Sequence, residues 1–294
     1  MFGKQRAAVL REVSGTAGPV ALLAEAIDEV SSRRRLIRYL VQADMKKRGS
    51  DTFLGNLWWI LDPLLQMVVY VVFVTILARR PAPDYPLFIF AAVLPWKWFS
   101  SVVTDATSSV VGQGSLIRQI AFPKIVLPIA SATAGVVGFG WGLLALIAIM
   151  LAYADRITPM LLWIPVIAAV QYVFSVAAAI FLSAANVFFR DLGNVAGHVL
   201  RLWWFLSPSL YSLSALDNLG VVRDHPILKT IAGLNPFAVL FEAYRAVIYG
   251  TPDGGLPVPP NLVNLFQLLV VSIVLVGLAA IFFKRLEPEF AKVL

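Results

Sequence analysis

The stretch IVLPIASATAGVVGFGWGLLALIAIML, residues 125–151, contains no charged side chain. A bilayer core about 30 Å thick is crossed by roughly 20 apolar residues in a helix, and this stretch is longer than that. Strands of a membrane barrel would instead be segments of about 10 residues with alternating polarity, a pattern that this chain lacks. Residues 125–151 therefore predict a membrane-spanning helix.

The whole chain has the composition of an integral membrane protein. Hydrophobic residues make up 59% of it, charged residues only 14%, and the mean hydropathy is +0.80; soluble domains are far more charged. Five further apolar runs resemble the first, at residues 56–78, 87–111, 160–189, 195–213 and 262–283. We therefore expect an all-α membrane protein with six transmembrane helices.

Lysine and arginine define the expected orientation. Six crossings put both termini on one side, and that side holds 17 of the 24 basic residues. By the positive-inside rule both termini face the cytoplasm. The net charge of +7 is then mainly a topology signal. It does not indicate nucleic-acid binding, because the basic residues are divided among short membrane-flanking segments.

Several kinds of chemistry are absent from the sequence. It has no cysteine and only two histidines, His198 and His225, without ligand spacing, so no metal site is predicted. It also lacks the phosphate-binding loop G-x-x-x-x-G-K-[ST]. No catalytic residue and no cofactor on this chain are expected. The first 55 residues lack the apolar core of a removable signal peptide, so residues 1–54 are expected to remain as a cytoplasmic segment before a membrane domain at 55–294.

A basic, turn-rich segment, residues 112–124, interrupts two of the apolar runs. Glycines precede Leu116 to Ala121 and Pro123 ends them, so they predict a very short surface helix. Its apolar side chains Leu116, Ile117 and Ile120 need a partner to cover them, and Arg118 and Lys124 could reach carboxylates on that partner. The alternative is an ordinary connecting loop lying on lipid.

Two other segments predict helices that do not cross the membrane. Residues 33–47 form a basic amphipathic pattern, typical of a helix in the headgroup plane, which could be an anchor or a gate for an anionic lipid. Residues 214–260 predict short re-entrant extracytoplasmic helices, one of them beginning with Asn235 as N-cap and Pro236 at the first position. There Glu242 and Arg245 could form an ion pair or guide a substrate.

The sequence resembles a known family over nearly its full length. The matching stretches are LGNLWWILDPLLQ (54–66), LPWKWFSS (94–101), SLIRQIAFPKIVLPIAS (115–131), NVFFRDL (186–192), WWFLSPSLY (203–211), LNPFAVLFEAYRAVIYG (234–250) and FFKRLEPEFAKVL (282–294). They are similar to the permease subunit of type-2 ATP-binding-cassette exporters, in the branch that exports lipid-linked polysaccharides such as O-antigens, teichoic acids and galactan.

The resemblance implies a homodimer in the bacterial cytoplasmic membrane, driven by two copies of a separate ATPase subunit that binds ATP and Mg²⁺. It identifies 112–124 as the coupling helix. The residues implied in ATPase coupling are Gly114, Leu116, Ile117, Arg118, Ile120, Phe122, Pro123, Lys124, Arg190 and Asp191. Those expected at a gate for the lipid-linked substrate are Arg34, Arg38 and Lys46. Those expected along the translocation path are Trp58, Trp59, Tyr70, Phe73, Trp98, Tyr211, Glu242 and Arg245.

Alternatives remain for the function and for the aromatic residues. Tryptophan and tyrosine near span ends also form the interfacial belt of membrane proteins. A type-2 exporter of a drug or small lipid would share the fold. A membrane-embedded glycosyl- or phosphotransferase acting on polyprenol substrates would need clustered acidic residues on a cytoplasmic loop, where Asp191 stands nearly alone.

Overall fold

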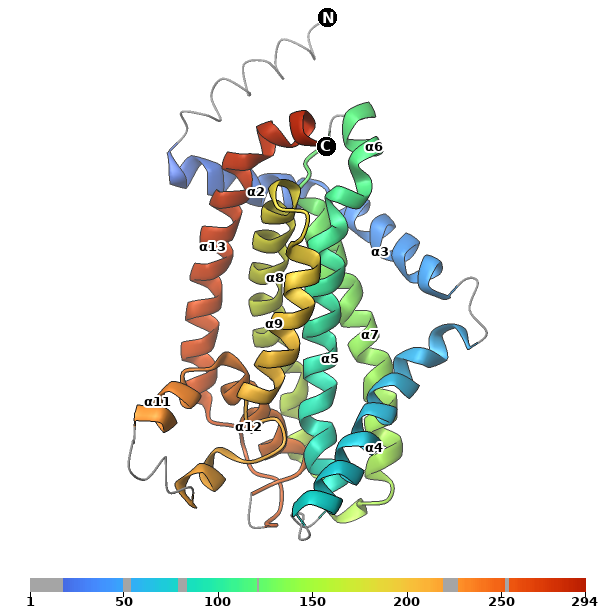
Figure 1. Cartoon of the computed structure of the whole chain (residues 1–294), viewed down its shortest axis with the longest axis vertical. Coiled ribbons are helices and arrows are strands. Elements are labelled where there is room, and N and C mark those ends of the chain that lie inside the picture. The colour runs from blue at the N-terminus through green and yellow to red at the C-terminus, as the bar shows by residue number, and fades with distance from the viewer. Residues whose placement is uncertain (1–17, 50–53, 79–83, 121, 219–226, 252–253) are drawn as a thin grey trace, which may run out of the picture.

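A computed structural model describes residues 18–49, 54–78, 84–120, 122–218, 227–251 and 254–294, and every regular element within these ranges is a helix. The helices form an elongated bundle (Figure 1). One end carries the short helix α6 (Gly114–Gln119) and the opposite end carries α12 (Pro236–Ile248). These are called the α6 end and the α12 end below. The expected segments 1–54, 112–124 and 214–260 each include residues outside the described ranges.

Five helical segments among the described residues are long and apolar enough to cross a membrane. They contain α4 (Trp58–Ala78), α5 (Tyr85–Ser109), α7 (Val126–Met150), α8 (Ile164–Phe188), which is preceded by the 3₁₀ turn η4 (Pro159–Trp163), and α13 (Leu262–Val293). Helix α5 is the central one, since α4, α7, α8, α9 and α12 all pack against it. In contrast, few residues of α4 are fully buried on this single chain.

The expected span at 195–213, the fifth of the six in chain order, is shorter in the structure. Helix α9 (Leu192–Leu206) has 15 residues and rises only about 22 Å, less than the thickness of the hydrocarbon core. It ends at Ser207, whose backbone is extended because a residue that precedes a proline disfavours the helical conformation. Pro208 therefore follows the end of the helix and does not kink it.

Arg245 of α12 holds the irregular segment that follows α9. Its guanidinium donates to the carbonyl oxygens of Pro208 at 2.7 Å and Tyr211 at 3.0 Å, and also to that of Ser209. The ring of Phe88 lies 3.8 Å from the guanidinium carbon. Backbone that is not helical needs such internal donors wherever water is absent, so α12 completes the structure of this segment.

The expected Glu242–Arg245 pairing is replaced by separate backbone contacts among the described residues. The Glu242 carboxylate accepts the backbone N–H of Leu213 at 3.1 Å, while Arg245 serves the carbonyls above. The predicted cap of α12 is confirmed: the Asn235 side chain accepts the N–H of Phe237 at 3.0 Å. Glu242 and Arg245 therefore both bind backbone groups of the 207–213 segment.

A second buried arginine organises the α12 end. Arg156, in the turn η3 (Ala154–Arg156), is only 4% exposed. It donates to the carbonyl oxygens of Tyr249 at 2.8 Å and Gly255 at 2.6 Å, and pairs with Asp84 at 2.9 Å. Three connecting segments that are far apart in sequence are thereby held together. Short helices η5 (Leu213–Asn218) and α11 (Ile227–Gly233) lie at the same end.

The α6 end gathers both terminal regions of the described chain. Helix α2 (Pro19–Ser32) packs across α13, and α3 (Arg34–Gly49) slants away from it along α7 to the turn η1 (Gly55–Leu57) (Figure 1). The turn η2 (Val111–Gln113) leads from α5 into α6. A second apolar core forms here, which includes Ile117, Phe283 and Phe290.

Replacing Arg245 tests its structural role. We expect Arg245→Met to lower the free energy of unfolding in detergent by about 3 kcal/mol, because the carbonyl oxygens of Pro208, Ser209 and Tyr211 lose the guanidinium donor. Arg201→Met is the matched control, since Arg201 is exposed on α9 and its loss should change stability little. Equal thermal unfolding midpoints for the two variants would contradict the assignment.

Candidate functional site

Helix α5 carries a polar face in the middle of an apolar bundle. Every residue between Leu87 and Ser109 that is not buried is polar: Lys97, Ser100, Ser101, Thr104, Asp105, Ser108 and Ser109. Spacings of three and four place them on one side of the helix. We call this set the α5 polar face. The sequence signal was available, since polar residues recur with helical period in the run 97–109.

The exposed faces of the other long helices have the opposite character. On α4 they include Val69 and Ile76, and on α13 Val271 and Leu278, all more than half exposed. Hydrocarbon offers no hydrogen-bond partner, so polar side chains within spans face protein or water. The α5 polar face is therefore suited to water or to a polar substrate, and the exposed faces of α4 and α13 to lipid.

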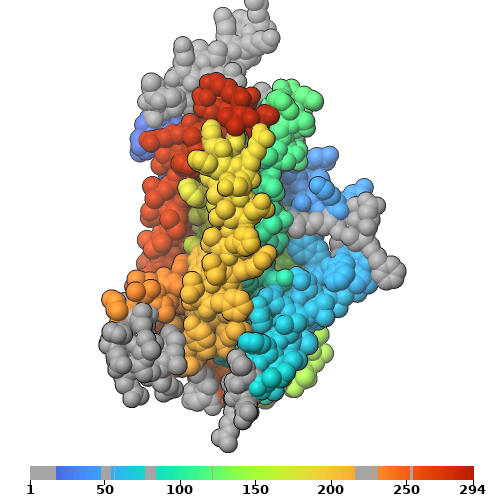
Figure 2. Space-filling view, viewed as in Figure 1, coloured from blue at the N-terminus to red at the C-terminus, as the bar shows by residue number. Residues whose placement is uncertain are grey.

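The α5 polar face opens between two neighbouring helices. Toward the α12 end α4 and α9 lie side by side (Figures 1 and 2), and there the rings of Tyr70 and Trp204 stack with centroids 5.3 Å apart. This contact covers α5 near the α12 end. Nearer the α6 end the helix is uncovered, and there its exposed side chains are polar.

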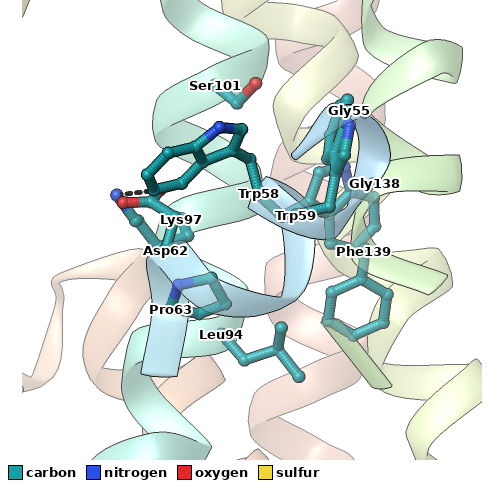
Figure 3. Close-up of a pocket in the computed structure, with 12 residues that line it drawn as sticks. Gly55, Trp58, Trp59, Asp62, Pro63, Leu94, Lys97, Ser101, Gly138 and Phe139 are labelled. Carbon is teal, nitrogen blue, oxygen red and sulfur yellow. Dashed lines mark ion pairs between the residues drawn. The ribbon is translucent and has the colours of Figure 1, made fainter. Parts of the chain in front are cut away.

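A cavity of about 350 Å³ adjoins the α5 polar face, and it lies between the start of α4, α5 and α7 (Figure 3). Trp58, Trp59 and Trp98 line it, together with an ion pair in which Lys97 Nζ lies 2.5 Å from Asp62. The Asp62 side chain is 58% exposed, as a charge on an aqueous path would be. Indole faces beside a paired charge can accept a neutral or weakly polar sugar ring without fixing one register.

Two features of the cavity wall are specific. A side chain at Gly138 would place its first carbon 1.8 Å from the ring of Trp59, so glycine is required for Trp59 to lie against α7. The indole N–H of Trp98 is buried and has no hydrogen-bond acceptor among the described residues. Sequence reasoning selected the three tryptophans but not the glycine that admits one of them.

The remaining path candidates lie elsewhere. Tyr70 packs into the core beside Trp204 and also accepts a hydrogen bond from Gln66 at 3.0 Å, while Phe73 is 52% exposed on α4. Tyr211, Glu242 and Arg245 lie at the α12 end, where Glu242 and Arg245 line a smaller cavity of about 140 Å³. The structure thus brings Trp58, Trp59 and Trp98 together at the larger cavity, and Tyr211, Glu242 and Arg245 together at a separate place near the α12 end.

Other aromatic side chains that could have met a substrate form the protein core instead. Trp96 lies 4.7 Å from Phe237 and 5.5 Å from Trp204, ring centroid to ring centroid. Trp96 and Trp204 are both less than 5% exposed. Their role in this chain is packing between α5, α9 and α12.

Fewer side chains in and after α6 are exposed to a partner than the sequence predicts. Ile117 is 6% exposed and packs in the second core with Phe290, so the expectation that a partner covers it is wrong. Lys124 was expected to reach a carboxylate on a partner, but its Nζ lies 3.6 Å from Oε1 of Glu287 in this chain. Arg118 and Ile120 are exposed; Leu116, Phe122, Pro123 and Lys124 are half-buried and Gly114 is buried.

Arg190 and Asp191 lie at the same end as α6. Both are exposed, and the Arg190 guanidinium donates to the carbonyl oxygen of Val293 at 3.4 Å. The neighbouring Leu294 lies beside Gly114. The surface around α6 available to another protein therefore includes Arg118, Ile120, Arg190 and Asp191.

Helix α3 has the amphipathic form that the sequence predicts. Arg34, Arg38 and Lys46 are exposed, while Leu36 and Leu40 are half-buried. The helix packs against α7 and leads to η1, whose Gly55 lines the cavity. Its role as a gate stays a prediction.

Long apolar helices, a polar face at span depth and an amphipathic helix beside it define a multi-pass membrane protein with a transport architecture. Residues 35–249 match the family model described as ABC-2 type transporter, and the chain belongs to that family. It is 33% identical to the O-antigen export system permease protein RfbA of Myxococcus xanthus, over 90% of this chain and 98% of that protein. It is also 27% identical to a protein of the same name from Klebsiella pneumoniae, over 88% of this chain and 95% of that protein.

Cysteine labelling tests whether the α5 polar face meets water. The chain has no native cysteine, so single cysteines report cleanly. We expect Thr104→Cys in membranes to react with a small cationic methanethiosulfonate about tenfold faster than Leu278→Cys, because the thiolate that reacts forms only in contact with water. Equal rates would indicate that lipid covers both helices.

Proposed function

We propose that this chain is the membrane subunit of an exporter that carries a lipid-linked polysaccharide of the O-antigen type across the bacterial cytoplasmic membrane. The observation that carries the proposal is the α5 polar face, which provides a polar route at span depth beside a tryptophan-lined cavity. The names of the relatives support the substrate class. Teichoic acid or galactan would have the same chemistry, a hydrated sugar polymer on a lipid carrier.

Six crossings remain the topology that we propose. Helix α9 and the segment that Arg245 holds, 207–212, would together complete the sixth. Both terminal regions lie at the α6 end, since Lys284 of α13 contacts Glu29 of α2 at 3.0 Å, and an even number of crossings requires this. The excess of basic residues assigns the α6 end to the cytoplasm.

A homodimer would enclose the polar face. On one chain this face is open, and lipid cannot satisfy its hydroxyl and charged groups. A second copy related by two-fold symmetry would place its own polar face opposite, with a shared aqueous path between them. Trp58, Trp59 and Trp98 would meet sugar rings along that path, and Arg34, Arg38 and Lys46 on α3 would meet the lipid phosphate at a lateral entrance.

The energy for export would come from a separate ATPase. The chain lacks a phosphate-binding loop, so ATP and Mg²⁺ would bind to that partner, of which two copies would serve the dimer. The partner would dock at the α6 end, on Arg118, Ile120, Arg190 and Asp191. Only contacts that differ between its nucleotide states can shift the permease between conformations.

Deleting the gene tests the proposed substrate. We expect the deletion strain to lose its surface polysaccharide and to accumulate the lipid-linked glycan inside, because synthesis continues while export stops. The measurement is immunoblotting of surface glycan together with mass spectrometry of extracted lipid-linked glycans; the complemented strain is the control. An unchanged surface glycan with a new sensitivity to drugs would instead favour the small-molecule exporter.

The coupling surface is tested at its exposed apolar residue. We expect Ile120→Asp to reduce co-purification of the partner ATPase and export by about tenfold, since a buried charge in an interface costs more than 1.4 kcal/mol. Ile120 is 54% exposed, so the chain itself should fold normally. Leu256→Asp, at an equally exposed apolar site at the α12 end, should leave both quantities unchanged. Full ATPase binding by the Ile120 variant would refute this surface.

A further inference from the structure

An ionic cluster centred on a buried lysine joins three cytoplasmic-end elements that are distant in sequence. Lys284, in α13, is only 4% exposed. Its Nζ lies 2.9 Å from a carboxylate oxygen of Glu25, 3.0 Å from Glu29 and 2.8 Å from Glu287. Glu25 and Glu29 belong to α2 and Glu287 to α13. One ammonium group therefore holds the N-terminal helix on the last long helix.

The same cluster reaches the chain just after α6. The second carboxylate oxygen of Glu287 accepts the backbone N–H of Lys124 at 2.9 Å, and Lys124 Nζ lies 3.6 Å from it. Lys124 follows α6 by five residues and precedes α7 (Val126–Met150). Glu287 therefore bridges Lys284 on one side and the α6–α7 connection on the other.

The composition of the cluster makes it sensitive to geometry. Three carboxylates share two lysines, and burial, with the negative charge of Glu287, raises the pKa of Glu29 above its ordinary value, while Lys284 opposes the rise. Charges removed from water are stable only while each keeps its partners. A displacement of α6 relative to α2 or α13 would separate these charged groups, which costs free energy. The three elements are therefore expected to move together.

Apolar contacts reinforce this connection. Ile117 of α6 packs in one core with Ala26 of α2 and with Phe283 and Phe290 of α13. Close-packed cores transmit displacement because they have few voids to absorb it. The ionic cluster and this core lie on the same three elements.

We propose that Lys284 and Glu287 are positioning residues that couple α6 to α13 and α2, so that a push on α6 by the partner ATPase is delivered to a full-length membrane span and to the N-terminal helix. This inference rests on the proposed function. It assigns to the C-terminal end of α13 the task of carrying motion from the cytoplasmic surface into the bundle.

The test compares transport with ATP consumption. The chain and its partner ATPase are purified together and reconstituted in vesicles that contain the lipid-linked glycan, and glycan exported per ATP hydrolysed is measured. We expect Glu287→Gln, which keeps the shape of the side chain, to lower this ratio roughly tenfold, in the range usual for coupled sites, while ATPase activity and the amount of complex stay near wild type. Lys292→Met is the control, because Lys292 pairs with Glu289 on the same helix but on its exposed surface.

A charge exchange separates transmission from mere stability. Glu29→Lys combined with Lys284→Glu keeps three carboxylates and two ammonium groups in the cluster, and we expect it to restore most of the ratio that Lys284→Glu alone loses. If Lys284→Glu fails to accumulate, the exchange variant and Glu287→Gln still decide the question. A ratio that stays at the wild-type value in Glu287→Gln, or export and ATPase activity that fall in parallel, would overturn the proposal.

One further arm separates this inference from the proposed function. Wild-type chain is paired with a variant of the ATPase partner that binds ATP but does not hydrolyse it. If export continues, the partner does not drive transport and the proposed function itself fails. If export stops while Glu287→Gln behaves as wild type, the proposed function stands and only the role of the cluster is rejected.

Discussion

Hydrocarbon offers no hydrogen-bond partner, and this constraint orders the whole structure. Wherever the backbone leaves the helical form in the interior, a side chain must replace the lost bonds. Arg245 does so for the segment after α9 and Arg156 for the loops at the α12 end, with donors within 2.6–3.0 Å of the carbonyl oxygens of Pro208, Tyr211, Tyr249 and Gly255. In the proposed six-span topology, the short α9 can belong to a complete crossing because Arg245 of α12 supplies donors to the segment that follows it.

The same constraint separates structural charges from functional ones. Arg156 and Arg245 are buried, and each is held by several backbone carbonyls. Asp62 and Lys97 lie in spans, yet on the single chain Asp62 is exposed and Lys97 is only half-buried, which lipid would not tolerate. Exposure at span depth, more than charge itself, marks the face that water or a polar substrate occupies.

Local patterns in the sequence predicted much of the fold. The apolar runs, the amphipathic helix from Arg34 and the Asn235 cap follow from residues within one or two turns of each other, so they could be read directly. The end of α9 was not predicted correctly, because the apolar run continues past Ser207 whereas the helix ends at Leu206. The inward position of Ile117 and the pairing of Lys124 with Glu287, 163 residues away, depend on tertiary contacts that one sequence does not reveal.

The role of the short helix α6 depends on the elements against which it packs. A six-residue helix is too short to be rigid alone, because most of its backbone groups lie in its terminal turns. Burial of Ile117 holds α6 against α13, and the hydrogen bond from Lys124 to Glu287 holds the segment that follows α6 against the same helix. Helix α13 is the longest in the described chain and packs along α8, which in turn contacts α5. A displacement applied at Ile120 thus has a continuous packed route to the helix that bears the polar face.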